Sequence, residues 1–168
     1  MSAEHLHLAF NHIPFLGAAF AIVPILLGLL LKNKALLLTG LGLAALTGWV
    51  TPVVMDTGER AYERYEEQPG RHFLDANFYE SLELHEHRAH DWSKVMYASA
   101  AAATLAFGLM VWKERIGRWA AWVALVLCVA STGSGIWIAE SGGKIRRPDF
   151  RMEMSGAKLP DAERHEED

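Results

Sequence analysis

Apolar residues are concentrated in four blocks, and the segments between the blocks are polar. The blocks are Leu8 to Leu31, Ala35 to Met55, Val95 to Trp112 and Trp119 to Ile138. A helix of about 20 residues crosses the hydrocarbon core of a bilayer, and each block approaches or reaches that length. The pattern therefore predicts an all-α integral membrane protein with four spanning helices.

We expect the spans at about residues 8–31, 35–55, 92–112 and 119–140, in a bundle that occupies residues 1–145 and is followed by a polar C-terminal tail, residues 146–168. This leaves no room for a separate soluble domain. The first block resembles a signal peptide only in its position. Its apolar stretch exceeds the roughly 7 to 15 residues of a signal-peptide core, and its leader MSAEHLH carries no lysine or arginine. We therefore interpret it as a spanning helix.

Charge in the short connections predicts the orientation. Lys32-Asn33-Lys34 and the segment from Lys113 to Arg118 are both basic, and short basic loops stay on the cytoplasmic side. We expect an up-and-down four-helix bundle in the bacterial cytoplasmic (inner) membrane, with the N and C termini and the middle segment in the periplasm. The basic run from Lys144 to Arg147 opposes this orientation, because it follows the fourth span on the outer side.

The middle segment, Asp56 to Asp91, is acidic and is expected to form a partly structured outer loop between the second and third helices. It holds ten acidic residues and four arginines, a net charge of −6. We expect Asp56 to Arg60 to end the second helix, Tyr62 to Glu67 to form a short helix, and Pro69-Gly70 to form a turn.

One helical face begins after this turn, well before the third apolar block. Its members recur at steps of three or four residues: Phe78, Leu82, His85, Ala89, Trp92 and Met96. The third helix should therefore extend beyond the membrane and turn His85 toward the bundle interior. Glu83, His87 and His90 share a second face, which we interpret as solvated, with a metal site as the alternative.

His12 is an ionisable residue in the opening turns of the first apolar block. Such residues in spanning helices usually face the bundle interior and mark functional sites. We expect His12 to face His85 at the outer end of the bundle. The alternative is that His12 lies with Asn11 at the interface, where water is near. The remaining histidines are terminal or loop residues to which we assign no role: His5, His7, His72 and His165.

Small residues recur in the last three spans. They are Gly40, Gly42 and Gly48, then Ala98 to Ala103, then Ser131 to Gly135. Because close backbone contact drives helix association in lipid, we assign them to helix packing. Room for a flat cofactor between helices is the alternative. The single Cys128 excludes a disulfide framework.

Four short motifs together resemble one family. They are Asn11-His12-Ile13-Pro14, Asp56-Thr57-Gly58-Glu59, His85-Glu86 and Ser141-Gly142-Gly143-Lys144-Ile145-Arg146-Arg147. The combination is similar to the patterns NHFP, TGE, HEE and TG-x-x-GGQIRH of the bacterial four-helix membrane proteins grouped as DUF2231. It extends from Leu8 to about Phe150. The family has no established activity, and the resemblance implies a component of a respiratory or other electron-transfer system.

The resemblance also implies site residues. Carried over position by position, they are His12, Glu59, His85 and Glu86. The chain departs from the family pattern at Lys144, where the family has glutamine, and at Arg147, where it tends to have histidine. A ligand that relatives place at that last position would be absent here.

The first function we consider is that of an integral membrane subunit of an electron-transfer complex. His12 and His85 would bind b-type haem, since two imidazoles fill both axial positions and leave none for oxygen. The acidic outer segment would then dock a soluble cytochrome by complementary charge.

Two alternatives remain open. In one, His12, His85, Glu59 and Glu86 bind an iron, zinc or manganese ion, because mixed nitrogen and oxygen donors suit these metals. In the other, the chain is a cofactor-free accessory subunit of a larger membrane complex, and the tail from Arg146 to Asp168 docks on a partner.

Other function classes find little support. We expect an electron-transfer or accessory subunit rather than an enzyme, because no nucleophile with a base, phosphate loop or nucleotide fingerprint is present. A net charge of −4 without a basic aromatic surface also argues against nucleic-acid binding.

The two basic connections yield a topology prediction. Reporters fused after Lys34 and after Arg115 should report a cytoplasmic location, and a reporter inserted between Gln68 and Arg71 should report a periplasmic one. The opposite pattern would show that the run from Lys144 to Arg147 sets the orientation.

Overall fold

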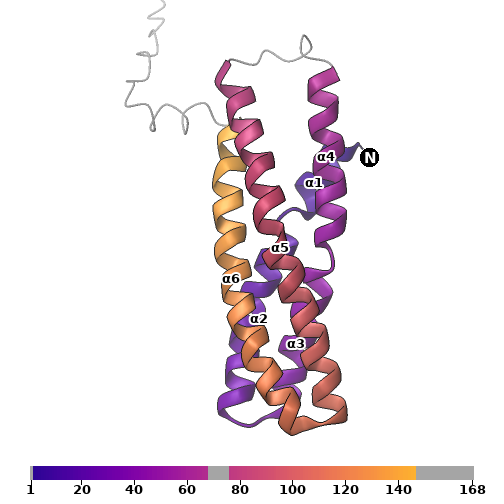
Figure 1. The fold of residues 1–168 in the computed structure, drawn as a ribbon, viewed down its shortest axis with the longest axis vertical. Coiled ribbons are helices and arrows are strands. Elements are labelled where there is room, and N and C mark those ends of the chain that lie inside the picture. Colours follow the sequence, from indigo (N-terminus) through magenta and orange to yellow (C-terminus); the bar gives the residue numbers. More distant parts are fainter. Residues whose placement is uncertain (1, 68–75, 147–168) are drawn as a thin grey trace, which may run out of the picture.

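The computed structural model describes residues 2–67 and 76–146, and these residues are helical almost throughout (Figure 1). Six helices follow one another: α1 (Ala3–Phe10), α2 (Ile13–Leu30), α3 (Lys34–Gly48), α4 (Thr51–Glu67), α5 (Ala76–Trp112) and α6 (Glu114–Arg146). No β-strand occurs within the described ranges. The expected all-α class is confirmed.

The helices form four rods that run up and down (Figure 1). Two rods are interrupted: the first consists of α1 and α2, and the second of α3 and α4. The other two rods, α5 and α6, are continuous. Four stretches are long and apolar enough to cross a membrane: Ala3–Leu30, Lys34–Arg64, Phe78–Trp112 and Glu114–Ile145. The chain therefore fits a multi-pass membrane protein. We call the end with the short connections, residues 31–33 and 113, the turn end, and the opposite end the far end.

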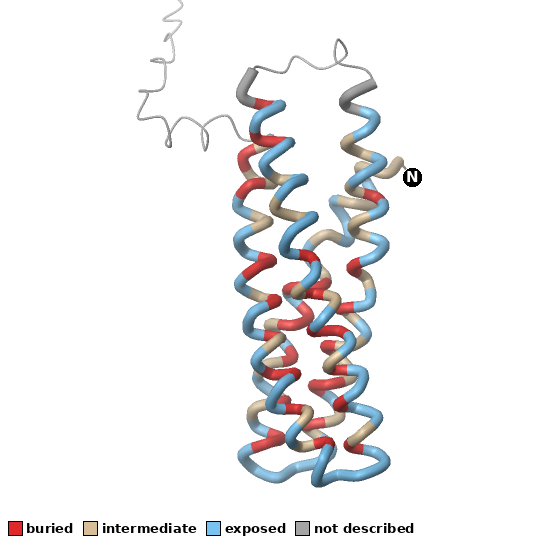
Figure 2. The backbone as a smooth tube through the Cα atoms, viewed as in Figure 1, coloured by how far each residue is buried: buried red, intermediate tan, exposed pale blue. Residues whose placement is uncertain are grey.

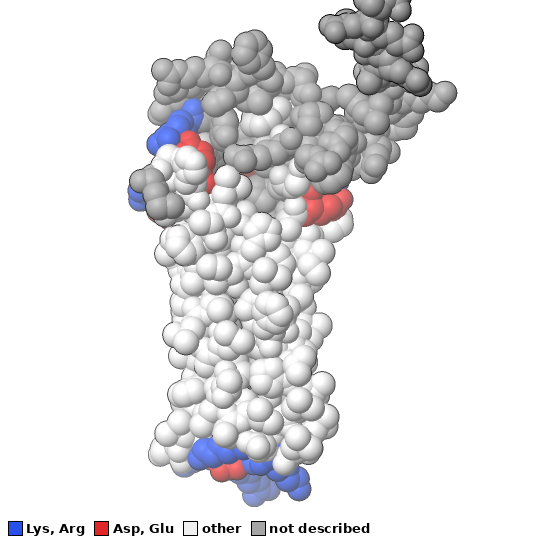
Figure 3. Space-filling view, turned by 180° about the vertical axis from the view of Figure 1, so that it is seen from behind, with Lys and Arg blue, Asp and Glu red and all other residues white. Residues whose placement is uncertain are grey.

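The rods are longer than a bilayer core is thick. α5 has 37 residues, which at 1.5 Å per residue gives about 55 Å, against a core of about 30 Å. Figure 3 shows a broad belt without Lys, Arg, Asp or Glu on one face, with charged side chains at both ends. The third rod thus begins before the apolar block, as the sequence pattern predicts.

Both rods of the N-terminal half are interrupted just before a proline. The first breaks at Asn11 and His12, and Pro14 is the second residue of α2. The second breaks after Gly48, and Pro52 is the second residue of α4. Proline has no N–H to donate four residues back, so it is favoured in the first turn of a helix, although Pro24 lies inside α2 without ending it. At the second break, the Thr51 hydroxyl donates to the Gly48 carbonyl at 2.7 Å in place of the missing N–H.

One sequence prediction about these rods is wrong. Asp56 to Arg60 was expected to end the second helix, but these residues lie inside α4, which continues to Glu67. The short helix expected from Tyr62 to Glu67 is the last part of α4. A single Gly58 does not terminate a helix that packs against a neighbour, and α4 packs against α1. The turn expected at Pro69-Gly70 lies outside the described residues.

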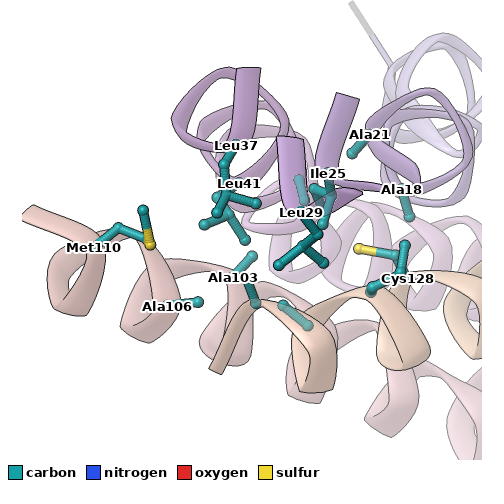
Figure 4. Packing of buried hydrophobic residues seen from close by; sticks show 14 residues of the cluster. Ala18, Ala21, Ile25, Leu29, Leu37, Leu41, Ala103, Ala106, Met110 and Cys128 are labelled. Atoms are coloured by element: carbon teal, nitrogen blue, oxygen red, sulfur yellow. The ribbon is translucent and has the colours of Figure 1, made fainter. Parts of the chain in front are cut away.

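The apolar core lies in the turn half of the bundle. Figure 4 shows how it forms between α2, α3, α5 and α6, and Figure 2 shows buried positions concentrated at that level. Its fully buried side chains include Ile25, Leu37, Leu41, Met110 and Cys128. In the far half, the buried residues include small hydroxyl side chains and one cation: Thr51, Thr57, Ser81, Ser93, Ser131, Ser134, Ser141 and Lys144.

Small residues let the helix backbones approach closely. A Cβ at Gly48 would lie 2.8 Å from Ala100 Cβ, and a Cβ at Gly135 would lie 2.2 Å from Phe15 Cβ. These contacts join α3 to α5 and α2 to α6, so the expected role of these glycines in packing is confirmed. Gly42 does not share it, since its nearest neighbour would lie at an ordinary 3.6 Å.

Two glycines of α6 give a matched test of this packing. We expect Gly135→Ala to lower the free energy of unfolding by about 1–3 kcal/mol, because the added methyl overpacks against Phe15. Gly133→Ala is the control, since a Cβ there meets nothing within 4 Å. Unfolding of the purified protein in mixed micelles measures both. Equal stabilities of the two variants would contradict the packing observed here.

Candidate functional site

His85 lies on the expected inward face of α5. Phe78, Leu82 and Met96 on that face are buried, and His85 and Ala89 are half-buried. Trp92 is the exception, because 48% of its surface is exposed. No residue of α5 between Leu82 and Ser93 is fully buried. This stretch of α5 is therefore covered less closely than the rest of the helix, and it contains His85.

The His85 ring is fixed by α6. Its Nδ1 lies 3.1 Å from the Ile138 carbonyl oxygen and 3.2 Å from Ser141 Oγ. Ser141 Oγ itself donates to the Ile138 carbonyl at 2.7 Å. Because a carbonyl can only accept, the proton of His85 belongs on Nδ1, and the neutral ring then presents a lone pair on Nε2.

His7 has the same arrangement on the other side of the bundle. It lies in α1, is half-buried, and its Nδ1 lies 3.0 Å from the Val54 carbonyl oxygen of α4. The proton therefore belongs on Nδ1 here too, and Nε2 carries the lone pair. Within the described residues, Nε2 of either histidine makes no hydrogen bond.

The two imidazoles face each other. The ring centroids of His7 and His85 are 6.4 Å apart, and the ring planes meet at 82°. We call them the imidazole pair. α4 and α6 anchor the pair by backbone carbonyls, and α1 and α5 carry the rings, so four helices converge at this point of the far half.

A glycine lies beside each ring. A Cβ at Gly58 of α4 would come within 2.9 Å of His7 Cε1, and one at Gly142 of α6 would come within 3.0 Å of His85 Cε1. A side chain at either position would push the ring away from its carbonyl. The motifs that contain Gly58 and Gly142 thus leave room for the two imidazole rings, because neither glycine has a side chain.

His12 lies elsewhere in the structure. It is exposed at the break before α2, where Nδ1 bonds to Asn11 Oδ1 and the ring lies 5.6 Å from that of Phe15. This placement matches the alternative in which His12 lies at the interface with Asn11. The partner that the structure brings to His85 is His7, to which the sequence pattern assigned no role.

The carboxylates of the expected metal site do not gather around His85. Glu59 and Glu86 are both exposed. In the described part of the chain, no three His, Cys, Asp or Glu side chains lie close enough to hold a metal ion together. The structure therefore does not bring three or more of His12, Glu59, His85 and Glu86 together at one site.

The remaining histidines are placed mostly as expected. His87 and His90 are exposed with Glu83 on the second face of α5, and His87 Nε2 lies 3.3 Å from Asp91. His5 is exposed and contacts Ser2. His72 and His165 lie outside the described residues.

A sequence signal for His7 existed. Residues 14, 18, 21 and 25 form the buried face of α2, and position 7 continues that face at the same helical spacing. A helix extended toward the N-terminus would therefore have turned His7 inward.

No family model, curated protein or solved structure matches this chain.

Thiol labelling tests the two faces of α5. In a Cys128→Ala background, cysteines at positions 85 and 89 should react slowly with a membrane-impermeant reagent, because both positions are half-buried. Cysteines at positions 83 and 87 should react fast, because both are exposed. Equal rates at all four positions would contradict the inward placement of His85.

Proposed function

We propose that this chain is an integral membrane subunit of an electron-transfer system in the bacterial cytoplasmic membrane, and that its imidazole pair holds b-type haem. The observation that carries the proposal is the pair itself. Two neutral rings from different helices present unshared Nε2 lone pairs at one level of the bundle. Facing histidines of a helical bundle are a common way to hold such a cofactor.

The spacing of the rings fits a shared metal. Two imidazoles that share one metal ion, with metal–nitrogen bonds of about 2.0–2.1 Å, would have ring centroids about 6 Å apart. The observed 6.4 Å is close to this separation. Ligating histidines also usually donate the other ring N–H to a carbonyl or carboxylate, as both rings do here.

Bound haem would supply one-electron transfer. A haem held by both His7 and His85 would transfer electrons and would not bind oxygen. The chain's own contribution is to fix ring orientation through Val54 and Ile138 and to leave space beside the rings at Gly58 and Gly142.

The position of the imidazole pair along the bundle suits electron exchange with a soluble partner. About 20 residues cross the core, so α5, which ends at Trp112, leaves the core near Trp92. His85 lies seven residues farther, or about 10 Å at 1.5 Å per residue. If the basic turn end is cytoplasmic, the pair lies on the periplasmic side, where Glu83, Glu86 and Asp91 are exposed. These carboxylates would dock a soluble cytochrome by complementary charge, and a larger membrane complex is the alternative partner.

A cofactor-free accessory subunit is the second candidate, and one observation favours it. The hydrogen bonds of the imidazole pair join α1 to α4 and α5 to α6, which is a sufficient structural role for both rings. In that case, the two rings serve only to join neighbouring helices by hydrogen bonds.

Absorption spectra of the purified protein, oxidised and then reduced, test the proposal. We expect haem bands in the wild type and their loss or strong weakening in His7→Ala and in His85→Ala, because each variant lacks one axial ligand. His87→Ala is the control, since that side chain is exposed on the second face of α5. His12→Ala distinguishes the observed pair from the one expected from the sequence.

The other outcomes are equally informative. Loss of the bands in His12→Ala but not in His7→Ala would overturn the assignment of His7. A protein without haem that contains a stoichiometric metal ion would favour the metal alternative. A protein with neither, in which His7→Ala lowers stability by about 1 kcal/mol, as for a broken interhelical hydrogen bond, would leave only the accessory subunit.

A further inference from the structure

A network of two cations and one carboxylate lies beside His85. Arg88 Nη1 is 3.0 Å from Glu140 Oε2, and Lys144 Nζ is 2.7 Å from Glu140 Oε1. Arg88 Nη1 also donates to the Trp137 carbonyl at 3.1 Å, and its guanidinium lies 3.9 Å from the centre of the Trp137 ring. We call Arg88, Glu140 and Lys144 the charged triad.

The triad carries surplus positive charge in a sheltered place. The side chains of Arg88 and Lys144 are only 14% and 11% exposed, whereas that of Glu140 is 47% exposed. Within the described residues, one carboxylate therefore pairs with both cations, and the net charge of these three side chains is +1. Sheltering a charge from water is costly unless it is well paired. Two cations that share a single counter-ion thus suggest a role beyond holding α5 against α6.

The triad and His85 are joined through short stretches of helix. Arg88 follows His85 by one turn of α5. Ser141 and Gly142, which contact the His85 ring, lie between Glu140 and Lys144 on α6. Along the two helices, Arg88 thus lies about one turn from His85, and Glu140 and Lys144 lie within one turn of the α6 residues that contact its ring, at about 5.4 Å per turn.

We propose that the charged triad raises the reduction potential of the cofactor held by the imidazole pair. This inference rests on the proposed function. Reduction adds one electron, supplied by the reductant, and no bond forms or breaks in the protein. A nearby positive charge stabilises the reduced state relative to the oxidised state, and does so more strongly where water is excluded. Arg88 and Lys144 therefore raise the potential, and Glu140 lowers it.

A redox titration of the purified holoprotein, followed by its haem bands, measures this effect. We expect Arg88→Gln and Lys144→Gln to lower the midpoint potential and Glu140→Gln to raise it. All three substitutions remove one or more ion pairs of the triad, so a purely structural disturbance would shift them in the same direction. Potential shifts of opposite sign would therefore show that the charges of the triad, and not a structural disturbance, change the potential. A tenfold change in the equilibrium constant for reduction corresponds to about 59 mV for a one-electron couple, and we expect shifts of up to that size.

Two further variants complete the design. Lys94→Gln is the matched control on α5, because Lys94 is exposed and pairs at 3.7 Å with Asp91, outside the triad. It should leave the potential unchanged. Arg88→Lys keeps the charge but loses the planar contact with Trp137, so it should retain most of the wild-type potential.

The result that overturns the inference is distinct from failure of the proposed function. Haem bands that persist in all variants, with potentials that do not move or that move in one direction, would overturn the role of the triad alone. A wild-type protein without haem would overturn the proposed function and this inference with it.

Discussion

The need to satisfy every backbone N–H and C=O group inside lipid determines most of this structure. Only helices and closed barrels meet that need across a bilayer, and this chain meets it with four helical rods. Two of the rods break just before Pro14 and Pro52. At the second break, the Thr51 hydroxyl donates to the Gly48 carbonyl in place of the missing N–H. The breaks in turn separate α1 from α2 and α4 from α3, so that a short N-terminal helix can pack on α4 and carry His7 inward.

The bundle divides into two halves of different character. In the turn half, the helices are held together by aliphatic side chains and close glycine contacts. The Arg118 side chain of α6 also donates to the Lys32 carbonyl at 3.1 Å. In the far half, buried hydroxyls, an imidazole pair and a charged triad replace the aliphatic core. The turn half is thus packed by apolar side chains, and the far half contains most of the buried polar groups.

Hydropathy and helical periodicity predicted the coarse structure well. They gave the four spans, the early start of α5 and the inward His85, because burial of a long apolar stripe depends mainly on local spacing. They failed where a contact between segments distant in sequence determines the structure. His7 precedes the apolar block and acquires its role only because α1 packs on α4. Asp56 to Arg60 looks like the end of a helix, yet α4 continues through it. Trp92 has the spacing of a buried residue, but about half of its surface is exposed.

Each ring of the imidazole pair is anchored within its own half of the chain. His7 bonds to Val54, and both precede residue 68, whereas His85 bonds to Ile138, and both follow residue 75. The pair therefore requires the two halves of the chain to pack together in the correct register. A slip of one helical turn, about 5.4 Å along the bundle, would lengthen the distance between the ring centroids from 6.4 Å to about 8 Å. If the pair holds haem as proposed, haem would bind only to bundles whose two halves have packed in the correct register.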